Sequence, residues 1–154
     1  MITNRQIIKY KSYSEARKLE RSYHLFGEDD NEIGTIEGNA NKYGELVSVV
    51  KVYDNKNQKK GLGFEAFKKV FCELNDEVPI TKIVGSWHNG GEFQDFDEGM
   101  STNLKIFLTC RKNKKDLKDC AFSTPTGKWA KKLGFNDCEI VLISSDVVNI
   151  NFKK

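Results

Sequence analysis

Apolar and polar positions divide the first third of the chain into short strand-like segments separated by turns. Residues 22–26, 32–37 and 45–53 are strand candidates, and the polar stretches GEDDN and GNANKYG lie between them. This arrangement predicts a meander of antiparallel strands. The third segment carries a nearly continuous apolar run, which is typical of a strand that is covered on both faces.

Two helices are predicted to flank this meander. Residues 14–20 read SEARKLE and predict a short helix with Ser14 as its N-cap. After the meander, five apolar residues recur at the spacing of an amphipathic helix: Phe64, Phe67, Val70, Phe71 and Leu74. Pro79 marks the end of this helix, and residues 80–87 read as another strand. A strand, a glycine-containing turn, a helix and a second strand form a crossover unit, which implies two parallel neighbouring strands.

The second half of the chain predicts two more helices and two closing strands. Met100, Leu104, Phe107 and Leu108 suggest a helix that starts near Ser101 or Thr102. Thr124–Pro125 opens the next helix, with proline at the favoured first position, and Gly134 ends it. Residues 139–144 and 147–152 are the strands. In the last of them Val148, Ile150 and Phe152 alternate as expected for a half-buried edge strand.

Composition places the chain among globular proteins of one domain. Hydrophobic residues make up 38% and charged residues 31%, which excludes a disordered chain. No apolar run approaches the roughly 20 residues that span a bilayer, and the first residues lack the apolar core of a secretory signal. We therefore expect one cytoplasmic domain over residues 1–154. The four cysteines form no CxxC pair and match no zinc spacing, so reduced thiols are expected and no metal site is predicted.

The segment between the apolar strand and the amphipathic helix has the features of a phosphate-binding loop. The first turn of a helix has unpaired N–H groups and a positive dipole end, and glycines there let a pyrophosphate approach the backbone. The candidate residues of this loop are Gln58, Lys59, Lys60, Gly61, Leu62 and Gly63. A tight turn with solvated lysines is the alternative. The pattern is neither a P-loop nor a dinucleotide fingerprint.

Two segments resemble motifs of the GNAT superfamily of N-acetyltransferases. Residues 58–63 match its pattern Q/R-x-x-G-x-G/A, and residues 129–135, WAKKLGF, are similar to its segment that ends in KLGF. The order of the predicted elements also agrees over residues 22–152. The resemblance implies an α/β (α+β) fold with a mixed, twisted central sheet and helices on both faces. Residues 88–122 would then be an insertion that is longer than is usual in the family.

The resemblance also implies a co-substrate and a reaction. Acetyl-CoA would donate its acyl group to a primary amine, and no metal would take part. The residues that would flank the acyl group and the pantetheine arm are Val50, Lys51, Val52 and Tyr53. The amides of residues 58–63 would hold the pyrophosphate. The acceptor stays open between a small molecule, a protein amine and an aminoacyl-tRNA, and so does the choice between a monomer and a homodimer.

Proton transfer is the part of this reaction for which the chain departs from the family. Many members carry a tyrosine that protonates the departing thiolate, and Ala130 stands at its position. A carboxylate commonly accepts the amine's proton, and Glu45, at the start of the strand that leads to the loop, is the candidate. His88, after the next strand, is a second candidate base because histidine titrates near neutrality.

Two other functions remain open at this point. Because Ala130 cannot donate a proton, the chain could be a catalytically weak or inactive GNAT-like binding module. The basic run RKNKKDLK at residues 111–118 could contact RNA, although no aromatic residues are interleaved in it for base stacking. The acidic residues Glu92, Asp95, Asp97 and Glu98 match no EF-hand loop and are expected to be solvated.

Overall fold

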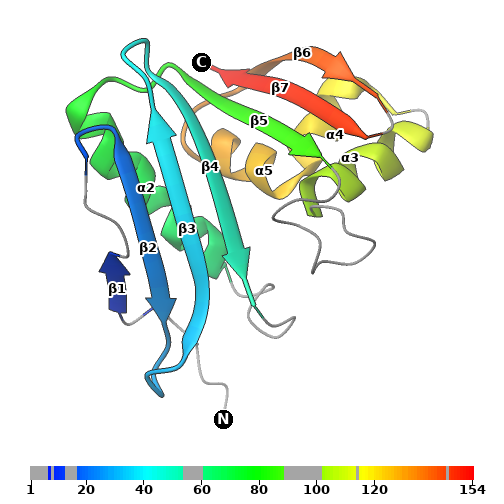
Figure 1. The fold of residues 1–154 in the computed structure, drawn as a ribbon. Helices are drawn as coiled ribbons and strands as arrows, with labels where there is room; N and C mark the ends of the chain where they lie inside the picture. Colours follow the sequence, from blue (N-terminus) through cyan, green and yellow to red (C-terminus); the bar gives the residue numbers. More distant parts are fainter. Residues whose placement is uncertain are drawn as a thin grey trace. The chain divides into compact units, whose positions relative to one another are not determined.

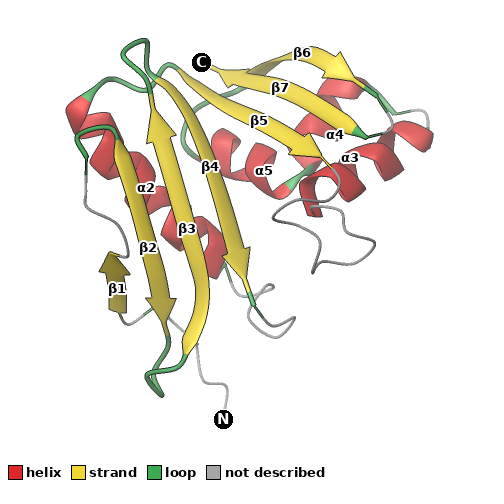
Figure 2. Cartoon of the chain, in the orientation of Figure 1, coloured by secondary structure: helices red, strands yellow, loops and turns green. Residues whose placement is uncertain are grey.

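The computed structural model of the chain describes residues 7, 9–12, 17–53, 61–88, 102–113, 115–144 and 146–154 (Figure 1). They form two compact units, Met1–Ile80 (unit 1) and Thr81–Lys154 (unit 2). In each unit antiparallel strands pack with α-helices, so the chain has an α/β fold, as predicted (Figure 2). Whether the units form the single expected domain, with an insertion at 88–122, stays a prediction.

Unit 1 contains the predicted meander and one strand that the pattern did not indicate. The strands β1 (Lys9–Ser12), β2 (Glu20–Phe26), β3 (Glu32–Ala40) and β4 (Glu45–Val52) pair antiparallel in this order. Helix α2 (Leu62–Glu77) follows β4 in the sequence. The meander and the amphipathic helix are thus confirmed. Each of β2 and β3 is longer than predicted, because the polar residues at their ends still pair with the neighbouring strand.

Helix α2 packs on the face of the sheet to which Gly38 belongs. A Cβ at Gly38 would lie 2.4 Å from a Val70 methyl group, so the helix approaches the backbone of β3 closely. Ile36 and Leu46 are fully buried on this face, together with Val70 and Leu74 from the helix. The apolar stripe read from the sequence is therefore the surface by which α2 packs on the strands.

Unit 2 has a three-stranded antiparallel sheet in which the last strand lies in the middle. Strand β7 (Val147–Lys153) pairs with both β5 (Lys82–His88) and β6 (Asp137–Ile143). The helices are α3 (Thr102–Lys112), α4 (Leu117–Ser123) and α5 (Pro125–Lys132). Aromatic rings fill the interior: Trp87 lies 6.3 Å from Phe107 and 6.4 Å from Phe152, between ring centroids.

Three expectations from the sequence are wrong. Residues 17–20 are not helical: Arg17–Leu19 form a turn and Glu20 begins β2; residues 14–16 lie outside the described part. The strand with Val148, Ile150 and Phe152 is central rather than an edge, and all three side chains are fully buried. Cys110 and Cys120 form a disulfide instead of reduced thiols, whereas Cys72 and Cys138 are free.

The two helix ends that the sequence predicted around residue 130 are confirmed. The Thr124 hydroxyl oxygen accepts from the Gly127 amide at 3.0 Å, and Pro125 holds the first helical position of α5. At the other end Gly134 has φ 94°, in the left-handed region. The Phe135 amide then bonds to the Ala130 carbonyl at 2.9 Å and the Gly134 amide to that of Lys131 at 3.1 Å, which is a Schellman motif.

Candidate functional site

The start of α2 is shaped by a glycine in the left-handed conformation. Gly61 is the N-cap residue, with φ 74° and ψ 8°, a backbone region that side chains with a Cβ rarely adopt. Its carbonyl accepts the first helical hydrogen bond, from the Glu65 amide at 3.1 Å. Leu62 directly after it is buried and fixes the first turn in the core of unit 1.

This helix start is open on the side of the cap residue. A Cβ built on Gly61 would meet no heavy atom of the described residues within 4 Å. Among the described residues no side chain makes a cap hydrogen bond at Gly61, in contrast to α4 and α5, which Asp116 and Thr124 cap. A helix start of this kind offers amide dipoles to an anion.

The last residues of β4 lie at the same end of unit 1 as this helix start. Gly38 is opposite Ser48 in the sheet and in contact distance of Val70. From Val70 back to Leu62 the helix rises about 12 Å, and from Ser48 to Val52 the strand runs about 13 Å. Figure 1 shows the beginning of α2 near the arrowhead of β4. The structure therefore brings the predicted residues 50–53 and 61–63 to one end of the unit.

The four residues at the end of β4 divide between the two faces of the sheet. Val50 and Val52 are opposite Ile36 and Gly34, on the face that α2 covers. Lys51 is opposite Thr35 on the other face, where Tyr53 also lies, two residues on. Tyr53 is 46% exposed.

A network of polar side chains that the sequence did not indicate surrounds Tyr53. Burial raises the pKa of the Tyr53 hydroxyl, and the negative charge of Glu32 raises it further. Glu32 also pairs with Nδ1 of His24, which is opposite Thr35 on the neighbouring strand. His24, Glu32 and Tyr53 are 8 to 29 positions apart in the sequence, and only the strand register brings them together.

Of the two predicted bases, Glu45 lies at the opposite end of β4. Glu45 begins the strand, about 23 Å from Val52 along seven residues. Its carboxylate accepts a hydrogen bond from the side-chain amide of Asn41 at 2.8 Å in the turn between β3 and β4. His88 is the last residue of β5, opposite Val147, and belongs to unit 2. Both roles stay predictions.

Ala130, which the sequence resemblance aligns with the tyrosine of the GNAT motif, is fully buried in α5. Gln58, Lys59 and Lys60 lie outside the described residues, as do Glu92, Asp95, Asp97 and Glu98. Within the described ranges no group of three histidine, cysteine or acidic residues could hold a metal ion. In the same ranges no helix has the length and apolarity that crossing a membrane requires.

No family model and no curated protein matches this chain. Solved structures resemble it in fold. The GNAT domain of PAT from S. lividans is 10% identical, with a TM-score of 0.48 over 92% of this chain and 65% of that chain. Aminoglycoside acetyltransferase AAC(6')-Ib in complex with coenzyme A is 12% identical, with a TM-score of 0.48 over 89% of this chain and 68% of that chain. The GNAT-like decarboxylase GphF in complex with isobutyryl-CoA is 13% identical, with a TM-score of 0.48 over 86% of this chain and 77% of that chain.

The chain thus spans 65% of the length of the S. lividans GNAT domain. At these sequence identities and TM-scores the similarity is one of backbone fold and is no evidence for an activity. What the chain does is inferred from its own residues.

Proposed function

We propose that the chain is an N-acyltransferase that uses acetyl-CoA to acylate a primary amine. The observation that carries the proposal is the start of α2, where Gly61 is left-handed and where the described residues provide no capping side chain and no heavy atom near its Cα. The loop sequence of residues 58–63, which resembles the GNAT motif, supports the same site. The loop lysines Lys59 and Lys60 would add positive charge that attracts the phosphates.

In this proposal each part of the described site has a distinct role. The amides of Gly61, Leu62 and Gly63 bind the pyrophosphate at the positive end of the helix dipole. The backbone of residues 50–53 lies beside the pantetheine arm and orients the thioester, so that proximity supplies much of the rate. Main-chain N–H groups of the site polarise the thioester carbonyl.

The reaction itself requires the acceptor amine to lose a proton. The neutral amine attacks the carbonyl carbon, the C–N bond forms, the C–S bond breaks and coenzyme A leaves as the thiolate. Glu45 and His88 are the proposed proton acceptors. Ala130 supplies no acid for the thiolate, so solvent or another group protonates it, and the acceptor's identity stays open.

Calorimetry with acetyl-CoA tests the binding site. We expect Gly61→Glu to weaken binding at least tenfold, because the carboxylate repels the pyrophosphate and occupies its approach, and a tenfold loss corresponds to about 1.4 kcal/mol. Gly61→Ala is the matched control, since it introduces the same backbone strain without the charge and its Cβ has room. Equal affinity for the wild type and Gly61→Glu refutes the proposed site.

A thiol-release assay with a panel of primary amines tests the reaction. We expect turnover with at least one amine, and a fall in kcat with a changed pH profile in either Glu45→Gln or His88→Gln. The exposed Glu28 offers a control, because Glu28→Gln removes one carboxylate to which the proposal assigns no role. Binding of acetyl-CoA without turnover for any amine would favour the second candidate, a binding module, which the buried alanine at position 130 supports.

A further inference from the structure

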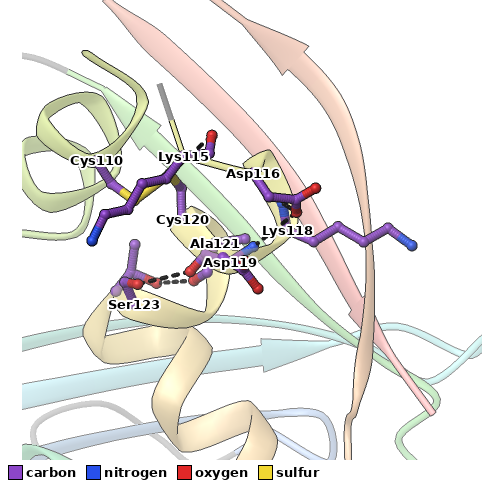
Figure 3. The surroundings of a disulfide bond; sticks show 9 residues. Cys110, Lys115, Asp116, Lys118, Asp119, Cys120, Ala121 and Ser123 are labelled. Carbon is purple, nitrogen blue, oxygen red and sulfur yellow. Dashed lines mark hydrogen bonds between the residues drawn. A yellow bond between two sulfur atoms is a disulfide. The ribbon is translucent and has the colours of Figure 1, made fainter. Parts of the chain in front are cut away.

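A disulfide joins two helices of unit 2. Cys110 lies in the last turn of α3 and Cys120 in α4, with their Cα atoms 5.4 Å apart (Figure 3). Their exposure differs: Cys120 is fully buried, whereas Cys110 is partly exposed. A reagent from solution therefore reaches the bond from the side of Cys110.

Cys110 borders a pocket of about 390 Å³ between α3 and α4. Its wall includes the stems of two lysines, two hydroxyl groups and one branched aliphatic side chain. The residues concerned are Lys105, Ile106, Thr109, Cys110, Lys115 and Ser123. Figure 3 shows the Lys115 side chain running beside the disulfide. The pocket thus combines an electrophilic sulfur with cationic groups and a short apolar surface.

The charged groups near this pocket are mainly basic. Arg111 and Lys112 in the last turn of α3 add to the two lysines of the wall. Asp116, next to Lys115 in the sequence, is engaged as the N-cap of α4 and accepts from the Lys118 amide at 2.9 Å and the Asp119 amide at 3.3 Å. Positive charge attracts anions and favours the thiolate form of a bound thiol.

We propose that this pocket binds a small anionic thiol, which exchanges with the Cys110–Cys120 disulfide. The thiolate of the ligand attacks Sγ of Cys110 and forms a mixed disulfide with it. The bond to Cys120 breaks, its sulfur leaves with the electron pair and takes up a proton. The ligand sulfur is oxidised and the Cys120 sulfur is reduced, so the step needs no other oxidant or reductant.

The exchange is reversible, and the burial of Cys120 keeps the displaced thiol in place for the reverse step. The Cys120 thiol stays inside unit 2, next to the mixed disulfide, and can attack Cys110 again to expel the ligand. The adduct accumulates only where the anionic thiol is abundant and held by the pocket. Formation of the adduct also breaks the covalent link between α3 and α4. The fraction of protein that keeps this link therefore depends on the concentration of the anionic thiol in the surroundings.

The test follows exchange in the purified, unreduced protein by intact mass spectrometry. Three thiols are compared: glutathione, whose negative charges are carboxylates, coenzyme A, whose negative charges are phosphates, and the uncharged 2-mercaptoethanol. We expect Lys105→Glu and Lys115→Glu each to slow exchange with the anionic thiols about fivefold or more. With 2-mercaptoethanol we expect changes of less than about twofold. Lys68→Glu on the exposed side of α2 is the matched control.

Two further measurements on the wild type make the outcome decisive even if a variant folds poorly. Added salt should slow the anionic thiols and leave the neutral one unchanged, because screening weakens surface attraction. Peptide mapping should find the adduct on Cys110. Two free thiols in place of the disulfide, an adduct on Cys120, or equal effects on anionic and neutral thiols would each overturn the proposal. The faster of glutathione and coenzyme A identifies the class of anionic thiol.

Discussion

At the scale of single residues, Glu73 holds α2 on the strands of unit 1. Its carboxylate accepts hydrogen bonds from the Tyr23 hydroxyl at 2.5 Å and from Nε of Arg21 at 3.2 Å. Nζ of Lys69, one turn earlier in α2, lies 3.3 Å from the second carboxylate oxygen and 4.9 Å above the ring of Tyr10. Three elements, β1, β2 and α2, therefore meet at one carboxylate.

These contacts make the stability of unit 1 sensitive to alkaline pH. Burial, and then the hydrogen bond to Glu73, raises the pKa of Tyr23 from 10 to about 12. Burial and the charges of Glu65 and Glu73 also raise the pKa of Tyr10. A tyrosine that stays neutral in the fold but ionises when unfolded stabilises the fold fully below pH 10, and this contribution is lost as the pH rises towards 12.

We therefore expect the free energy of unfolding to fall between about pH 10 and 12, and to fall less steeply in the variant Tyr10→Phe/Tyr23→Phe. Urea unfolding at several pH values, followed by far-UV circular dichroism, measures this. Tyr43→Phe, at an exposed tyrosine in the turn between β3 and β4, is the control. The same pH dependence in the double variant and the wild type would contradict the role of the two hydroxyls.

At the scale of the elements, the junction of α4 and α5 brings the backbones of two helices close together. The Thr124 hydroxyl donates to the Ala121 carbonyl at 2.6 Å while its oxygen caps α5. A Cβ at Gly127 would lie 2.0 Å from that carbonyl oxygen, so only glycine lets the two helices meet at this distance. Backbone atoms cannot move aside as a flexible side chain can.

We expect Gly127→Ala to lower the free energy of unfolding by about 2 kcal/mol or more, because the added methyl group forces α5 away from α4. Lys128→Ala, at the next and exposed position, should change it by less than about 0.5 kcal/mol. Thermal unfolding of both variants measures the difference. A Gly127→Ala variant as stable as the wild type would show that the junction relaxes without cost.

The elements also show which features of the fold the sequence could predict. The periodic apolar residues of α2 and the cap signals of α5, Thr124–Pro125 and Gly134, are local and predicted both helices correctly. Strand β1 and helix α4 were not predicted, because KYKS and LKDCAFS lack a clear apolar period and depend on partners far along the chain. The position of β7 between β5 and β6 is likewise a property of strand pairing, which alternation alone does not encode.

The candidate site divides in the same way. Gly61 was predicted from its place between a strand and a helix, and the structure describes it there in the conformation that favours glycine. The network of Tyr53, Glu32 and His24 was not predicted, since it arises from the register of three strands. The Cys110–Cys120 link was not predicted either, because a spacing of ten residues bridges two helices only once α3 and α4 have packed.

At the scale of the whole molecule, the two units differ in the fluorescent side chains they contain. The chain has two tryptophans, Trp87 and Trp129, and both belong to unit 2. Intrinsic tryptophan fluorescence therefore follows unit 2, and tyrosines near α2 follow unit 1. Phe152 is a suitable position for a test in unit 2, because it is fully buried, 5.4 Å from Phe122 and 6.4 Å from Trp87 between ring centroids.

We expect Phe152→Ala to lower the free energy of unfolding seen by tryptophan fluorescence by about 3–5 kcal/mol, because it leaves a cavity between β7 and the helices. Phe152→Leu, which keeps most of the volume, should cost clearly less. Urea titration of the three proteins gives the comparison. Equal midpoints for the wild type and Phe152→Ala would show that this ring does not support the core of unit 2.

The central place of β7 has a consequence for synthesis on the ribosome. Val147–Lys153 is the segment that joins β5 to β6, yet it follows both in the sequence. A nascent chain that has emerged only as far as residue 146 lacks the strand that pairs with β6 and with one edge of β5. In that interval the unpaired backbone at these strand edges is what a ribosome-bound chaperone would encounter.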